Sequence, residues 1–347
     1  SIVFAADRGG RNDLYAMDVD GSYVVQLTQD PWDDGEPAWS PDWTKLAFAS
    51  NRSGVWQIYV MNADGSAVTQ LTEDAADHLS PYWSPDGMRI AFMRFDEPNW
   101  DICVVEVEGK SEVQLTRDLA GDMFPSWSPA GSRIAFASNR DGDYDIYAMD
   151  ADGGNVVRLT EDPANEMYPS WSPDGKRIAF VRGPFGGEIY VMKADGSQRR
   201  NLTGDPAGAD IDPCWSPDGL RLAFTRGLGL DGGIFTVDAD GANLVNLTTH
   251  PGEETAPAWS PRQVSEYAPQ LPEVLEAVVE DTLAGSTPVV FADARLEAVV
   301  RAAVAEVQNH PHRMSPIWVT DRLMVPQTAL LKVVVAVDAP AVIRRVA

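Results

Sequence analysis

Residues 124–160 read FPSWSPAGSRIAFASNRDGDYDIYAMDADGGNVVRLT, and this stretch carries the signals of four short strands. The first strand is expected at 124–128, before a turn that contains proline and glycine, and the second at 133–138. The third is expected at 145–150 and the fourth at 156–160. Asp152-Gly153 predicts the hairpin turn between them, because glycine accepts the positive φ that such turns require. The stretch therefore predicts one small antiparallel sheet.

The same pattern recurs along the chain with a period of 44 residues. A tryptophan followed by Ser-Pro recurs at Trp39, Trp83, Trp127, Trp171, Trp215 and Trp259, and a phenylalanine recurs at Phe4, Phe48, Phe92, Phe136, Phe180 and Phe224. Four short strands in a repeat of about 40–50 residues are the signature of β-propeller blades. A helical solenoid would need apolar residues at a spacing of 3.6, whereas these strands alternate.

The two ends of the repeat region predict how the propeller closes. Residues 1–28 supply only the last three strands of a blade, and residues 256–260 supply a single first strand. Joined together, they complete an all-β, six-bladed propeller of four-stranded blades over residues 1–262. Closure by the C-terminal strand removes the exposed sheet edge.

The repeat resembles that of the TolB-type propeller family. The motifs that carry this resemblance are WSPDGKRIAF at 171–180, IYVMNADG at 58–65 and the Leu-Thr ending at 71–72. The resemblance covers residues 1–262 and implies a bacterial protein of the periplasm or the extracellular space. It also implies a binding and scaffolding role with a protein partner. Related propellers precede hydrolase domains in some peptidases, but the Gly-x-Ser-x-Gly elbow of those hydrolases does not occur in this sequence.

The composition restricts the class of partner. The chain has 52 acidic against 27 basic residues, a net charge of −25, which would repel nucleic acid and anionic membranes and favour cationic partners. The most apolar stretch near the C-terminus is interrupted by Lys332, Asp338 and Pro340, so we expect no membrane span. We expect a monomer that binds a protein or peptide through a cationic contact.

The pattern changes after the propeller. A helix is predicted from Pro272 to Leu283, and Asp293 can cap a second helix. Residues 263–347 are therefore predicted to form a small, mostly helical extension.

A second series of residues predicts a functional site. Three places before the proline of each expected first strand, a carboxylate stands in five of six repeats; the six residues are Asp34, His78, Asp122, Glu166, Asp210 and Glu254. If the blades are equivalent, these side chains form a ring around one channel opening. Such a ring would attract a hard ion such as Ca²⁺, a Lys or Arg side chain or a peptide amino terminus. Alternatively, each carboxylate caps a turn, and the blade repeat multiplies that local function.

Two further hypotheses concern chemistry at this ring. A glycosidase needs two carboxylates with different pKa values, and equal decoration of every blade does not single out such a pair, so we expect no catalytic residue. His78 is the one member of the series that is not a carboxylate. It could act as a lone acid/base or as a metal ligand, but we favour the hypothesis that it arose by sequence drift. We expect a non-catalytic binding scaffold. The alternatives are a carbohydrate-active or hydrolytic propeller, or a sensor or gating domain of a larger protein.

Overall fold

The computed structural model describes residues 1–264, apart from Gly9 and residues 184–185, 206–207, 228–231 and 249–251, and two short strands near the C-terminus. The chain divides into two units, Ser1–Val264 and Ser265–Ala347. In the second unit, β25 (Val334–Val335) pairs antiparallel with β26 (Ile343–Arg344). The helices predicted to begin near Pro272 and Asp293 lie outside the described residues.

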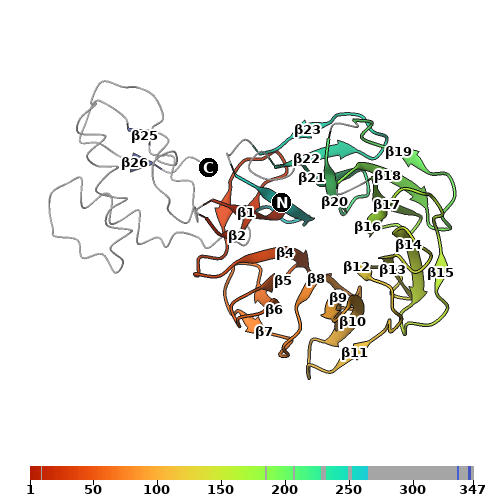
Figure 1. Ribbon diagram of the computed structural model, residues 1–347. Coiled ribbons are helices and arrows are strands. Elements are labelled where there is room, and N and C mark those ends of the chain that lie inside the picture. Colours follow the sequence, from red (N-terminus) through yellow and green to blue (C-terminus); the bar gives the residue numbers. More distant parts are fainter. Residues whose placement is uncertain are drawn as a thin grey trace. The chain divides into compact units, whose positions relative to one another are not determined.

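In the described part of the first unit, the strands form six four-stranded antiparallel sheets arranged as a ring (Figure 1). We name these sheets blades A to F and give their strands from the centre outward. Blade A comprises β24 (Glu254–Trp259), β1 (Ile2–Asp7), β2 (Asn12–Met17) and β3 (Val25–Gln26). Blade B comprises β4 (Asp34–Trp39), β5 (Lys45–Ser50), β6 (Gln57–Asn62) and β7 (Thr69–Gln70). Blade C comprises β8 (His78–Trp83), β9 (Arg89–Asp96), β10 (Asn99–Glu106) and β11 (Glu112–Gln114).

The remaining three blades repeat this order. Blade D comprises β12 (Asp122–Trp127), β13 (Arg133–Ser138), β14 (Asp145–Asp150) and β15 (Val157–Arg158). Blade E comprises β16 (Glu166–Trp171), β17 (Arg177–Arg182), β18 (Glu188–Lys193) and β19 (Arg200–Asn201). Blade F comprises β20 (Asp210–Trp215), β21 (Arg221–Arg226), β22 (Gly233–Asp238) and β23 (Val245–Asn246).

The predicted six-bladed fold and its closure are confirmed. The C-terminal strand β24 pairs with β1, with Ile2 opposite Trp259, and so completes blade A from both ends of the propeller region. Two strands of blade D have other boundaries than predicted. Its first strand begins at Asp122 rather than at 124, and its outermost strand has only two residues, because that strand has a neighbour on one side only. Among the described residues, no helix has the length and apolar character needed to cross a membrane.

The apolar core lies between blades rather than within them. Between blades B and C, Ile58 and Leu71 pack with Trp83 and Phe92, and the Trp83 indole Nε1 donates a hydrogen bond to the Ala38 carbonyl at 3.1 Å. The repeated phenylalanines of the second strands are fully buried. Each repeat therefore stabilises its neighbour, as expected when a single blade cannot bury both of its faces.

Each first strand contains a β-bulge at its proline. In β4 the register shifts between Gly35 and Ala38, since Pro37 has no N–H to donate to the ladder. The residue before each proline adopts a left-handed backbone, with φ between 51° and 56°; these residues are Glu36, Ser80, Phe124, Tyr168, Asp212 and Ala256. Non-glycine residues with a left-handed backbone are uncommon. Because all six blades have one at the same position, this bulge conformation is part of the repeated blade structure.

Candidate functional site

The six residues of the predicted ring occupy equivalent positions at the start of the first strands. All six side chains are buried, with exposed fractions of 0–1%. They therefore do not present free groups to a partner in this structure.

Five of these residues are carboxylates, and each forms an ion pair with an arginine from its own blade. The pairs are Glu254–Arg8 at 2.6 Å, Asp34–Arg52 at 2.9 Å, Asp122–Arg140 at 2.9 Å, Asp210–Arg226 at 2.6 Å and Glu166–Arg182 at 3.8 Å. The arginine also lies over the aromatic side chain of the third strand, for example Arg52 at 4.9 Å from the ring centroid of Tyr59. The carboxylate, the guanidinium and the aromatic ring together close one end of each of these blades.

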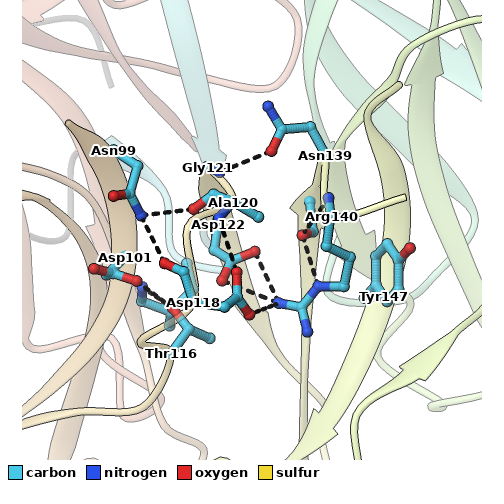
Figure 2. A network of polar contacts seen from close by, with 12 residues as sticks. Asn99, Asp101, Thr116, Asp118, Ala120, Gly121, Asp122, Asn139, Arg140 and Tyr147 are labelled. Atoms are coloured by element: carbon cyan, nitrogen blue, oxygen red, sulfur yellow. Dashed lines mark hydrogen bonds and ion pairs between the residues drawn. The ribbon is translucent and has the colours of Figure 1, made fainter. Parts of the chain in front are cut away.

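Figure 2 shows this arrangement in blade D. Arg140 lies between two carboxylates, Asp122 at 2.9 Å and Asp118 at 3.2 Å, and its Nε donates to Ser138 Oγ at 2.8 Å. Burial raises the pKa of Asp122, while hydrogen bonds from Ser138 and the charge of Arg140 oppose that shift. The network uses the carboxylate oxygens inside the blade, so the predicted binding of Ca²⁺ or of a partner by this ring stays a prediction.

Turn capping, the alternative interpretation, is carried out by the residue before the ring position. Asp33 Oδ1 accepts the Asn12 backbone N–H at 3.1 Å, and Asp77 Oδ1 accepts the Trp56 N–H at 2.9 Å. Each of these bonds joins a blade to its predecessor. The carboxylates at these positions therefore accept backbone N–H groups of the adjacent blade, whereas the alternative hypothesis assigned the capping of turns to the ring residues themselves.

His78 departs from the arginine pairing. Its Nε2 lies 3.2 Å from Asp74 Oδ1, and its ring packs on Phe92 with centroids 4.9 Å apart. Burial lowers the pKa of His78 to about 4, although the nearby charge of Asp74 opposes this shift. The imidazole is consequently neutral near pH 7.

A cavity of about 400 Å³ opens along the centre of the propeller and receives side chains from all six blades. Its walls are the second halves of the first strands and the Trp-Ser-Pro turns that follow them. The repeated residues of the wall include Trp39, Trp83, Trp127, Trp171, Trp215 and Trp259, and Pro37, Pro81, Pro125, Pro169, Pro213 and Pro257. The cavity is thus largely apolar and aromatic, which is typical of ligand-binding sites.

Six further wall residues differ from blade to blade. They stand two residues after the buried ring, at the left-handed position of each bulge, and we call them the channel set: Glu36, Ser80, Phe124, Tyr168, Asp212 and Ala256. Phe124 and Tyr168, from neighbouring blades, stack with centroids 3.9 Å apart. One side of the channel set is therefore aromatic, whereas Glu36 and Asp212 come from the two blades that flank blade A.

The two carboxyls of the channel set are electrostatically unusual. Burial and the nearby charge of Glu36 raise the pKa of Asp212 to about 7. Burial also raises the pKa of Glu36, whose Oε2 accepts the Ser80 backbone N–H at 2.6 Å. Among the described wall residues of the cavity there is no Lys, Arg or His. A cationic group that entered the cavity would meet two carboxyls with no competing basic residue in the wall.

Sequence reasoning missed the channel set because its members share no residue type. A signal for them exists, since each stands directly before the proline of the first strand, where a bulge is expected.

Cys103 has a buried side chain and Cys214 a partly buried one, and both are free thiols.

The comparisons with known proteins place this architecture in a family. A model of the TolB beta propeller domain matches residues 1–94 and 74–264. The structure is similar to TolB from Acinetobacter baumannii, with 25% identity and a TM-score of 0.67 over 75% of this chain, and the match spans 66% of that protein. It is also similar to the putative TolB from Agrobacterium tumefaciens, with 28% identity and a TM-score of 0.61 over 69% of this chain and 90% of that one.

Enzymes share the fold as well. An oligogalacturonate lyase in complex with manganese has 17% identity and a TM-score of 0.50, over 72% of this chain and 74% of the lyase. At that identity the likeness concerns the fold alone. No curated protein matched the sequence. Since the family model covers most of the chain, this protein belongs to the TolB beta propeller domain family.

Proposed function

We propose that this propeller is a non-catalytic binding protein of the bacterial envelope or of the extracellular space. It takes a segment of a protein or peptide partner into the central cavity. A cationic group of that segment, either a Lys or Arg side chain or an amino terminus, lies between Glu36 and Asp212. The observation that carries this proposal is a pair of carboxyls in an aromatic cavity with no basic residue among its described wall residues.

The cavity suits a peptide in three respects. Its volume of about 400 Å³ admits a few side chains but not a folded domain. Tryptophan and proline faces offer large apolar contacts and lose little side-chain entropy on binding. Burial and the charge of Glu36 both raise the pKa of Asp212, and a cation between the two carboxyls would offset the repulsion between them. The family resemblance supports the envelope location.

The test is a binding titration with short peptides that contain one Lys or a free amino terminus, each compared with its acetylated form. The double variant Glu36→Gln/Asp212→Asn should bind the basic peptides at least about tenfold more weakly than the wild type. The matched control Asp152→Asn/Glu161→Gln makes the same two kinds of substitution on the exposed surface and should bind as the wild type does. Equal binding by all three proteins would refute the proposal.

One observation favours a second candidate. A carboxyl with a pKa of about 7 beside another carboxyl could serve as a general acid on a saccharide, and a lyase of carbohydrate shares this fold. Turnover of oligosaccharides by the wild type, lost in Asp212→Asn, would favour this enzyme over the binding protein.

A further inference from the structure

Blade C differs from the other five blades at three positions that lie together at one corner. Where blade C has His78, the others have carboxylates. Blade C has Cys103 opposite Phe92. In the other blades an aromatic residue stands opposite the equivalent phenylalanine; these residues are Tyr15, Tyr59, Tyr147, Tyr190 and Phe235. Where blade C has Glu112 on the outermost strand, the equivalent residues are Val24, Val68, Val156, Arg199 and Leu244. All three departures introduce a side chain of a kind that ligates metals.

Two of these side chains converge with a carboxylate of the preceding loop. One ligand atom each from Asp74, His78 and Glu112 lies within 4.8 Å of the other two. His78 Nε2 and Asp74 Oδ1 are 3.2 Å apart, and the Cys103 thiol donates a hydrogen bond to the Glu112 carboxylate. The three groups come from β8, from β11 and from the loop between β7 and β8.

The histidine of this cluster lacks the hydrogen bonds that a buried imidazole normally has. The His78 side chain is 0% exposed, and neither ring nitrogen has a hydrogen-bond partner among the described residues, although Asp74 Oδ1 lies 3.2 Å from Nε2. A buried polar atom without a partner is costly, and a bound ion is one of the recognised ways in which proteins satisfy such an atom.

We propose that Asp74, His78 and Glu112 bind a divalent transition-metal ion, of which Zn²⁺ fits the donor set best. One imidazole nitrogen and two carboxylate oxygens leave a fourth tetrahedral position for water. A hard ion such as Ca²⁺ would require more oxygen ligands than the cluster offers.

Without metal, Arg94 supplies one positive charge that partly compensates the carboxylates of the cluster. Its Nε lies 3.1 Å from Asp74 and 3.8 Å from Glu112, while its Nη1 lies 3.2 Å from Asp96. In the five other blades the buried ring carboxylate pairs with an arginine at the end of the second strand or just after it, whereas here the residue at the carboxylate's position is His78. Arg94 is partly exposed and can keep Asp96 as its partner when a metal takes Asp74 and Glu112.

The experiment measures Zn²⁺ binding to the full chain by calorimetry, with excess Mg²⁺ present to saturate the acidic surface. We expect one tight site per chain. His78→Asp and Glu112→Val introduce residues that other blades already have, so both variants should fold, and each should lower the Zn²⁺ affinity by about 100-fold. Glu108→Gln, which removes an exposed carboxylate of the same blade, and the double variant His310→Ala/His312→Ala should retain the tight site.

A second readout is the absorption spectrum with Co²⁺ in place of Zn²⁺. Tetrahedral cobalt gives strong ligand-field bands, and these should appear in the wild type and disappear in His78→Asp. The proposal is overturned if the wild type shows no tight site, or if His78→Asp and Glu112→Val, shown to be folded by circular dichroism, bind Zn²⁺ as tightly as the wild type.

Discussion

Asp210 and Asp212 stand two residues apart on the same strand, β20, and their surroundings are opposite in character. Asp210 receives two hydrogen bonds from the Arg226 guanidinium, at 2.6 and 2.8 Å, and is closed off inside the blade. Asp212 lies in the wall of the central cavity, where burial and the charge of another carboxyl, Glu36, raise its pKa. The first aspartate holds the blade together, whereas the second remains available to a ligand.

The same contrast extends around the propeller. The ring that contains Asp210 is nearly uniform, since five of its six members are carboxylates, and each of the five is paired with an arginine. The channel set that contains Asp212 has six different residues. In a repeat protein, a residue that recurs in every copy more often builds the repeat, while a position that varies around a shared cavity can define what the cavity binds.

The largest effect is expected from Asp210→Asn. The substitution leaves Arg226 with the more distant carboxylate of Asp205, at 3.7 Å, and removes the charge that neutralised a mostly buried guanidinium. The free energy of unfolding should fall by about 3 kcal/mol, as in other broken buried pairs. Urea denaturation at pH 7 measures this loss. A change below about 1 kcal/mol would show that the buried ring does not stabilise the blade.

The substitution Asp212→Asn should increase the free energy of unfolding, by less than Asp210→Asn decreases it. The pKa of Asp212 is raised from 3.8 to about 7 in the folded chain, so between these pH values the folded state binds a proton that the unfolded state lacks. The stability of the wild type therefore falls as the pH rises from 4 to 7, and the full cost is present above pH 7.

Asparagine carries no charge and avoids that cost. At pH 8 the Asp212→Asn variant should be more stable than the wild type by about 2 kcal/mol, and the difference should disappear toward pH 4. Urea denaturation of both proteins at the two pH values tests this. Equal stability at pH 8 would mean that Asp212 is not held in an unfavourable environment.

These two aspartates also show what the sequence could and could not predict. The fold was predictable because Trp, Phe and Gly-containing turns recur at one spacing, and each has a physical role in every copy. The equivalence of Asp34, Asp122 and Asp210 was predictable for the same reason. The burial of these three side chains could not be predicted. Each partner arginine stands 16 to 18 residues later in the sequence, and the fold of the blade is what brings it to the carboxylate.

The channel set could not be found by repetition, because Glu36, Phe124 and Asp212 have no chemistry in common. Their shared feature is conformational: the bulge before each proline turns these side chains toward the cavity. In blade C, by contrast, His78 and Glu112 of the candidate metal site are of kinds that ligate metals, but neither recurs at its position in the other blades. His78, Cys103 and Glu112 are scattered in the sequence, and only the folded sheet, in the order β8, β9, β10 and β11, brings them near one another.

The smallest expected effect is a pH dependence of ligand affinity, and it is the most specific test of the proposed role of Asp212 in binding. A cationic ligand binds the ionised carboxyl and therefore competes with a proton, so its affinity should increase as the pH rises through the pKa of about 7. Between pH 6 and pH 8 the affinity of a basic peptide should increase by about tenfold in the wild type. In Asp212→Asn it should change much less, because the carboxyl whose pKa is about 7 has been removed. Asp210 provides the control on the same strand, since its carboxylate is already paired with Arg226. In a folded Asp210→Asn variant the pH dependence should persist, and its loss there would show that the proton competing with the ligand is not on Asp212.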